Sequence, residues 1–386
     1  ADQAEDEYKK GYNELERYQF REAIAHLERA ATAVQLPEFY LTLSQAYQEL
    51  QELSRAEDAI RLGLKLMMGR NDDGMEAEML GQLSSILADA EDVDGALSYA
   101  ERAEKLATKT FGSNDPRAAK YVNMVAICLS DKGDLKGARD FEERALRITE
   151  EAYGPDDLRV ASQAGNLGQF LEGLGDFDGA LENTRRALKI DEKKLGPDSE
   201  SVATDAGNLA LMLRDKGELG EAVKFAQRSL EINERIYGPD HPYVAAALTV
   251  VGLMFEAKSE PESALKLYRR ALEINERAYG LSHPHVGLQA RLIGQLLLGR
   301  SDLDGALAWT QRAIRIDEDN FGKDSIAWAT EAETLGVIFY DKGDLAGAAE
   351  YTKKALTIFE RVNGEDSSQA QKARSTLNII RQKMHR

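Results

Sequence analysis

A repeat of 42 residues runs through most of this chain and constrains its fold more than any other feature. Two series of small residues mark the repeat. The alanines are Ala96, Ala138, Ala180, Ala222, Ala264, Ala306 and Ala348, and the glycines are Gly112, Gly154, Gly196, Gly238, Gly280, Gly322 and Gly364. Because a single core stops growing near ~250–300 residues, a chain of 386 residues must be divided. The repeat therefore predicts an array of similar units stacked on their neighbours.

Each repeat contains two stretches with the apolar spacing of an α-helix. In the first stretch of one repeat, Ala164, Leu167, Gly168 and Leu171 recur at i, i+3, i+4 and i+7. The small residue at the Gly168 position would let the second helix approach closely. A short Gly-Asp-Leu type of turn joins the two stretches, which predicts antiparallel neighbours. We therefore expect helical hairpins and no strands.

Residues that favour helix starts recur at the same period. The eight positions are Asp73, Asp115, Asp157, Ser199, His241, His283, Ser325 and Ser367. Six of the eight are Asp or Ser, whose side chains cap the first turn of a helix. His283 and His285 could instead be two metal ligands, but no cysteine or third histidine lies near them. We interpret them as loop residues, so no metal site is expected.

The spacing predicts three parts. Residues 1–70 would form two shorter hairpins of about 34–36 residues, because the Ala-Ile pairs in this part lie closer together. Residues 71–364 would form seven hairpins of 42 residues. Residues 365–386 would form an amphipathic helix that caps the exposed end of the stack. The expected fold class is therefore all-α.

Composition narrows the possible partners and the compartment. The formal net charge of −18 would repel a phosphate backbone, so nucleic acid is not expected as a partner. No apolar run approaches the ~18 residues that a membrane span needs. The single cysteine, Cys128, excludes an intramolecular disulfide and is expected to be a small buried side chain. These features suggest a cytoplasmic protein, with processing and export as the alternative.

The repeats resemble those of the tetratricopeptide family. Small residues match in both helices, and the loop at 237–245 reads Tyr-Gly-Pro-Asp-His-Pro-x-Val-Ala, which is similar to the 42-residue repeats of kinesin light chains. Arg-Ala-Leu-x-Ile at 186–190 belongs to the same pattern. The resemblance implies a right-handed superhelical solenoid whose first helices line a concave groove. It also implies that the groove binds peptides or extended segments.

In kinesin-type repeats, a pair of asparagines in the first helix bonds the main chain of the ligand. The first asparagine of that pair matches Asn123, and the second matches Asn166 and Asn208. A solvated surface position or a bond between helices is the alternative for these side chains. The full set of expected groove residues is Asn123, Ser162, Asn166, Gln169, Thr204, Asn208, Arg214, Thr249 and Arg291.

Two of these residues are basic. Arg214 and Arg291 could each bind a ligand carboxylate in a bidentate contact. Pairing with acids of the same chain is the alternative, and we favour it because the chain is so acidic. For the asparagines, replacing Asn166 and Asn208 with Ala is expected to leave folding nearly intact while weakening ligand binding.

The sequence predicts a binding scaffold and no enzyme. It contains no nucleophile–base pair, phosphate-binding glycine loop or zinc motif, so no catalytic residue and no cofactor is expected. The expected partner is a protein or extended peptide with an apolar anchor and basic flanks, held along residues 119–257. The alternative is a sensing module of a larger regulatory system, such as a signalling ATPase, a protease or a transcription regulator.

Overall fold

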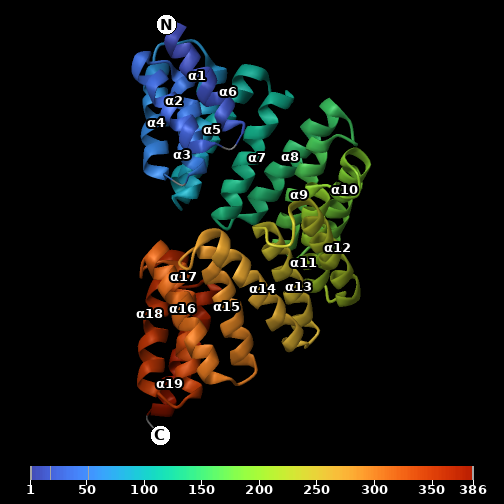
Figure 1. The fold of residues 1–386 in the computed structure, drawn as a ribbon, viewed down its shortest axis with the longest axis vertical. Helices are drawn as coiled ribbons and strands as arrows, with labels where there is room; N and C mark the ends of the chain where they lie inside the picture. The colour runs from blue at the N-terminus through green and yellow to red at the C-terminus, as the bar shows by residue number, and fades with distance from the viewer. Residues whose placement is uncertain (1, 18, 51, 385–386) are drawn as a thin grey trace. The chain divides into compact units, whose positions relative to one another are not determined.

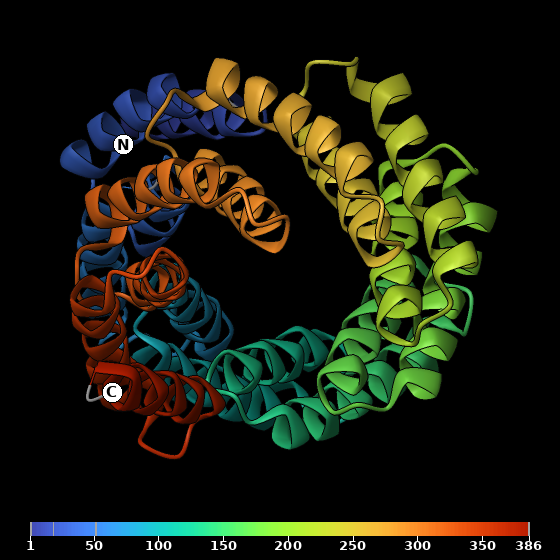
Figure 2. The same cartoon turned by 90° about the horizontal axis from the view of Figure 1, so that it is seen from below.

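The computed structural model describes residues 2–17, 19–50 and 52–384. The described residues form nineteen α-helices and no strand, which confirms the all-α solenoid. The chain divides into two compact units, residues 1–194 and residues 195–386. Within each unit, successive helices lie side by side in chain order (Figures 1 and 2).

The N-terminal unit consists of five hairpins. Its helices are α1 (Asp2–Leu15), α2 (Phe20–Ala33), α3 (Pro37–Glu49), α4 (Leu53–Met67), α5 (Asp73–Asp89), α6 (Val93–Phe111), α7 (Pro116–Asp131), α8 (Leu135–Tyr153), α9 (Leu158–Gly173) and α10 (Phe177–Leu195). The helices of the first two hairpins are shorter than the later ones. We call the odd-numbered helix of each hairpin its first helix and the even-numbered helix its second helix.

The C-terminal unit consists of four hairpins and one further helix. Its helices are α11 (Glu200–Asp215), α12 (Leu219–Tyr237), α13 (Pro242–Ala257), α14 (Pro261–Tyr279), α15 (Pro284–Gly299), α16 (Leu303–Phe321), α17 (Ile326–Asp341), α18 (Leu345–Asn363) and α19 (Ser368–Met384). Helix α19 packs on α18 and buries Leu377 and Ile380. The last two residues of the segment 365–386 lie outside the described residues.

Glycines on the first helices bring the two helices of a hairpin together. A Cβ atom built on Gly168 would lie 2.4 Å from Oγ1 of Thr184, on the second helix of the same hairpin. A Cβ atom on Gly252 would lie 2.4 Å from the ring of Tyr268. Larger side chains on the second helix therefore fill the space that the glycines leave, so the two helices of each of these hairpins pack closely.

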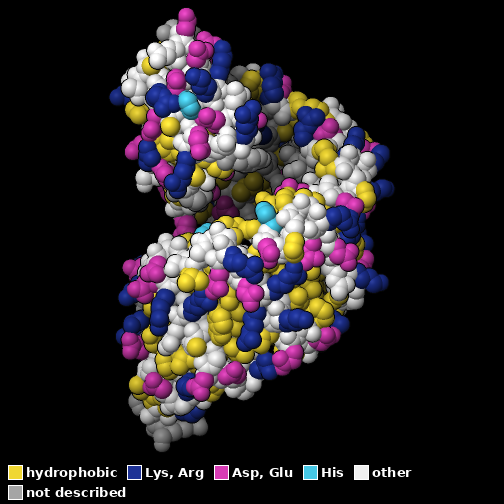
Figure 3. All heavy atoms as spheres, in the orientation of Figure 1, with side chains coloured by type: hydrophobic (Ala, Val, Ile, Leu, Met, Phe, Trp, Pro, Cys, Tyr) yellow, Lys and Arg dark blue, Asp and Glu magenta, His cyan; other side chains and the backbone are white. Residues whose placement is uncertain are grey.

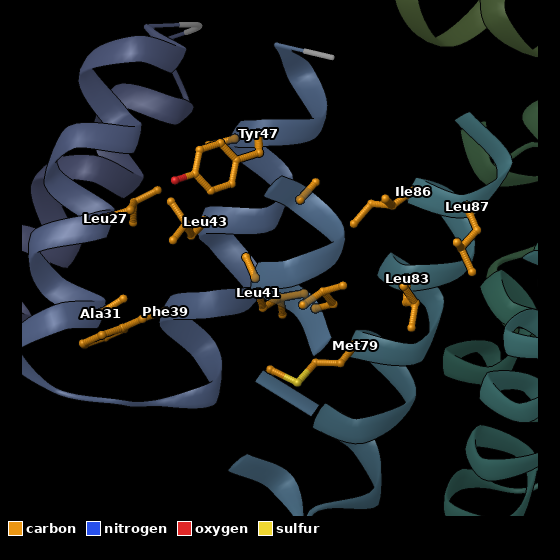
Figure 4. Packing of buried hydrophobic residues seen from close by; sticks show 14 of the residues in the cluster. Leu27, Ala31, Phe39, Leu41, Leu43, Tyr47, Met79, Leu83, Ile86 and Leu87 are labelled. Carbon is orange, nitrogen blue, oxygen red and sulfur yellow. The ribbon is translucent and has the colours of Figure 1, made fainter. Parts of the chain in front are cut away.

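The core of the N-terminal unit continues from hairpin to hairpin. Leu27 of α2 packs beside Leu43 and Tyr47 of α3, and Leu83 and Ile86 of α5 face them across the next layer (Figure 4). Leu27, Leu83 and Ile86 have no exposed surface. Each layer is therefore closed by the next, as expected for a stacked array.

Side-chain caps begin most of the longer first helices. Asp115, Asp157 and Ser199 accept a backbone N–H at the start of α7, α9 and α11. The expectation for Asp73 is wrong by one residue: Asp72 is the cap, and its Oδ1 accepts from the Met75 N–H at 3.0 Å. Two adjacent aspartates compete there, and the backbone of Asp73 is already helical.

Histidines occupy the cap position of α13 and α15. Nδ1 of His241 accepts from the Tyr243 N–H, and Nδ1 of His283 accepts from the His285 N–H, each at 3.2 Å. Each histidine ring also stacks on the tyrosine that ends the preceding helix; the ring of His283 lies 4.3 Å from that of Tyr279. An imidazole can accept this bond only while Nδ1 carries no proton.

Candidate functional site

In the N-terminal unit, two predicted groove asparagines surround a buried carboxyl group. Asn123 of α7 donates from Nδ2 to Oε2 of Glu142, on α8, at 2.7 Å. Glu142 has no exposed surface, and burial raises its pKa to about 7. Hydrogen bonding to Asn123 and Asn166 acts in the opposite direction. Asn166 therefore has a partner within its own unit, so the expectation that its loss leaves folding nearly intact does not fit the structure.

The other predicted groove residues of the N-terminal unit are on the surface. Ser162 and Gln169 are exposed on α9, on the same side of the helix as Asn166. Cys128 of α7 is buried as expected, and its Sγ lies 3.6 Å from Oγ of Ser84. The first-helix face of this unit is therefore polar where α9 reaches the surface.

In the C-terminal unit, α11 presents a polar surface. Thr204 is exposed and donates its hydroxyl to the Glu200 carbonyl at 3.1 Å, and Asn208 is half-buried one turn further along. A Cβ atom on Gly207 would meet only Oγ of Ser229, at 3.5 Å. The surface beside Asn208 thus has room for a ligand main chain to approach.

Both predicted groove arginines pair with acids of this chain. Nε of Arg214 lies 2.6 Å from Oδ1 of Asp215. Nε of Arg291 lies 2.5 Å from Oε1 of Glu331 on α17, and its Nη2 lies 3.4 Å from Oδ2 of Asp317 on α16. The structure thus supports intramolecular pairing over a ligand contact for these two side chains.

The Arg291 cluster holds two buried carboxyl groups with one cation. Glu331 and Asp317 are 0% and 1% exposed. Burial raises the pKa of Glu331 to about 7, against the opposing effect of Arg291, and Asp317 raises it further. Burial also raises the pKa of Asp317. One guanidinium cannot balance two full negative charges, so the cluster favours holding a proton near neutral pH.

Thr249 of α13 belongs to a second polar contact of the same unit. Its hydroxyl donates to the Ala245 carbonyl at 2.8 Å, and Nε2 of Gln289, on α15, donates to the hydroxyl oxygen at 2.8 Å. Around this pair the surface is apolar: Tyr243 and Leu288 are 49% and 38% exposed. Hydrophobic side chains also lie between charged ones on the visible face of the C-terminal unit (Figure 3).

The sequence reasoning missed the buried polar side chains. Glu142, Asp317 and Glu331 lie at helix positions where most other repeats carry small, apolar or uncharged residues. An acid at a repeat position that is uncharged in most other repeats was the available signal. The ring centroids of His283 and His285 lie 5.0 Å apart, with the rings tilted by 43°, and the described residues contain no group of three His, Cys, Asp or Glu that could hold a metal ion. No helix within the described ranges is long and apolar enough to cross a bilayer.

The tetratricopeptide repeat family matches residues 75–151, 159–232 and 202–277 with one repeat description and 332–369 with another. These matches cover more than half of the chain, and the chain belongs to the tetratricopeptide repeat family. The curated proteins contain no match to the sequence.

Several solved structures share the fold at low sequence identity. The apo form of the quorum sensor NprR from B. thuringiensis is 13% identical, with a TM-score of 0.61, over 92% of this chain and 98% of its own. A Rap protein complexed with Competence and Sporulation Factor is 12% identical, with a TM-score of 0.55, over 90% and 98%. BtubC (BKLC) from P. vanneervenii is 21% identical, with a TM-score of 0.51, over 61% and 94%.

Proposed function

We propose that this chain is a scaffold that binds an extended protein segment along the exposed side of its first helices. Asn208 is the main observation in support. Its side chain is half-buried beside an open glycine, and among the described residues it has no hydrogen-bond partner. A carboxamide offers both a donor and an acceptor, so it can bond a ligand main chain without reading its sequence.

The adjoining surface supports an apolar anchor on the ligand. Val250 of α13 and Leu292 of α15 occupy the repeat position of Asn208, and both are half-buried. Polar and apolar surface thus follow one another along the C-terminal unit. The net charge of −18 favours basic residues on either side of the anchor and disfavours nucleic acid. The tetratricopeptide fold is typically a non-enzymatic scaffold, and nothing in this surface calls for a cofactor.

The test begins with a pulldown from the source cells, followed by mass spectrometry of the bound proteins. Titration calorimetry then compares the wild type with Asn208→Ala and Thr204→Ala. We expect Asn208→Ala to lose ~1–3 kcal/mol of binding free energy, the usual cost of leaving a polar group unpaired. Asn114→Ala, in an exposed loop, is the matched control. Equal affinity of Asn208→Ala and the control would move the binding site away from the first helices.

The alternative is a sensing module of a larger regulatory system. The similarity to a quorum sensor and to a Rap protein in complex with a factor, each over 90% of this chain or more, supports this alternative. Hydrogen exchange of the full chain with and without the identified partner separates the two functions. A sensor would change protection in hairpins that do not contact the partner, whereas a passive scaffold would change it only at the contact.

A further inference from the structure

A pocket of about 320 Å³ opens between the first helices α13 and α15. Rings and aliphatic side chains line it, together with two amides and a hydroxyl. The lining residues are Pro242, Tyr243, Ala246, Thr249, Asn275, Tyr279, His285, Leu288 and Gln289. None of these described lining residues is Lys, Arg, Asp or Glu.

Gln289 lines this pocket, and its side chain carries an acceptor oxygen without a donor. The side chain is 2% exposed, and its Oε1 has no hydrogen-bond partner among the described residues. The orientation of the amide is fixed by its neighbour: the hydroxyl proton of Thr249 goes to the Ala245 carbonyl, so the hydroxyl oxygen can only accept from Nε2 of Gln289. A buried acceptor without a partner is costly, and a ligand that brings an N–H would satisfy it.

The walls restrict what that donor can be. Tyr243 and Tyr279 are 49% and 42% exposed, so their rings can be reached from solvent. A carboxylate would meet the Gln289 oxygen as a second acceptor, and an aliphatic side chain would leave that oxygen unpaired. A planar guanidinium stacks on tyrosine faces, carries five N–H donors and is weakly hydrated for a cation. Arg291, two residues after Gln289 on α15, is already paired with Glu331 and Asp317.

We propose that this pocket holds the guanidinium group of an arginine side chain on the bound segment. The inference rests on the proposed function and assigns one contact within it. Gln289 would accept from the guanidinium, while Tyr243 and Tyr279 would cover its faces. The long aliphatic stem of the arginine would lie against Leu288 and Ala246.

The test is a selection from a random library of 12-residue peptides displayed on phage, with the full chain as bait at pH 7.5. We expect the selected peptides to share an arginine at one position. Selected peptides without a shared arginine, including sets that share tryptophan or tyrosine instead, would overturn the pocket assignment and leave the proposed function standing. A selection that yields no peptide would contradict the proposed function itself.

The strongest selected peptide is then synthesised with arginine, lysine or citrulline at the shared position. Citrulline keeps the shape and removes the charge, and we expect its affinity to fall at least about tenfold, with lysine in between. On the protein, Gln289→Leu is expected to lose about tenfold, as for one hydrogen bond to a charged group. Gln295→Leu, exposed on the same helix and outside the pocket, should bind within about twofold of the wild type.

Tyr243→Leu is the second variant, because its ring is half exposed and its removal leaves the core intact. We expect it to weaken the arginine peptide more than the citrulline peptide, since the ring face attracts the cation and not its neutral analogue. Equal affinities for the arginine and citrulline peptides in the wild type would overturn the proposal.

Discussion

The two units neutralise buried carboxyl groups in different ways at the same repeat position. Asn123 in the N-terminal unit and Arg291 in the C-terminal unit are four repeats apart, and each extends from a first helix to a buried acid. Asn123 and Asn166 surround one carboxyl group, Glu142, with amides. Arg291 joins two carboxyl groups with one guanidinium. The first cluster therefore holds its carboxyl with amides and a proton, whereas the second adds a guanidinium to two carboxyls.

The two units also differ in their helix caps. Asp115 caps α7 in the N-terminal unit, and hydrogen bonds from the Arg117 side chain and backbone lower its pKa to about 2. His283 caps α15 in the C-terminal unit, and burial together with the charge of His285 lowers its pKa below the usual value. The first cap therefore stays ionised in mild acid, while the second loses its acceptor there.

Removing Arg291, the cation of the buried cluster in the C-terminal unit, should have the largest effect on stability. Arg291→Ala leaves Glu331 and Asp317 buried together without a cation, and breaking such a pair costs about 3–5 kcal/mol. Hydrogen exchange of the full chain should show lost protection over α15 to α17. The control is Arg300→Ala. Arg300 pairs with Glu262 at the surface, where the two side chains are 35% and 73% exposed. A loss no larger than that of the control would show that protons alone neutralise the two acids.

Replacing the buried acid of the N-terminal unit should change how stability depends on pH. The folded pKa of Glu142 is raised to about 7, so the folded state binds a proton more tightly than the unfolded state. Its contribution is therefore complete below the unfolded pKa of ~4.3 and declines as the pH rises toward 7. Glu142→Gln abolishes this decline and should be more stable than the wild type by roughly 3–4 kcal/mol at pH 8, with little difference at pH 4.5.

Protection of α7 to α9 against hydrogen exchange at the two pH values provides the measurement. Glu143→Gln is the matched control, because it is the adjacent glutamate and its side chain is 46% exposed. A gain of the same size at both pH values would mean that Glu142 is not protonated in the folded state, and that the amides alone stabilise its charge.

The amide donor itself should contribute less than the guanidinium of the other unit. Asn123→Ala removes the 2.7 Å bond to Glu142 and should cost about 1–3 kcal/mol at pH 8, where the carboxyl is charged. At pH 5 the cost should be smaller, because the carboxyl is then neutral and can be left with fewer donors. Urea or thermal unfolding followed at both pH values measures this difference, with exposed Ser162→Ala as the control. A pH-independent cost would place the effect of Asn123 in packing.

The sequence predicted the hairpins well because their determinants are local. The Gly168 position, the turns and most of the caps can each be recognised within one repeat, and the all-α hairpin fold that they predict is confirmed. The buried polar contacts could not be predicted in the same way. Glu142 meets Asn166 of the next repeat as well as Asn123 of its own, and Gln289 lines a pocket made by three helices, so their partners depend on how neighbouring repeats stack. At the start of α5 the local pattern is ambiguous, because Asp72 and Asp73 could each cap the helix, and the structure uses Asp72.

Protonation of the histidine cap of α15 should have the smallest effect on stability. A change of pH alone distinguishes this cap from the aspartate cap of α7. His283 accepts the His285 N–H through an unprotonated Nδ1, so its contribution is present above the unfolded pKa of ~6.5 and is lost as the pH falls through the lower folded value. A cap is worth about 1 kcal/mol, and a protonated imidazole at a helix N-terminus also opposes the helix dipole.

Protection of the first turn of α15 should therefore fall between pH 7 and pH 5, while that of α7, capped by Asp115, should not. His283→Asp should abolish the fall in α15 and leave α7 unchanged, because an aspartate cap stays charged across this range. If α15 in the variant still loses protection in acid, the pH dependence arises elsewhere in the C-terminal unit. The Arg291 cluster, in which the pKa of Glu331 is raised, is then the next group to test.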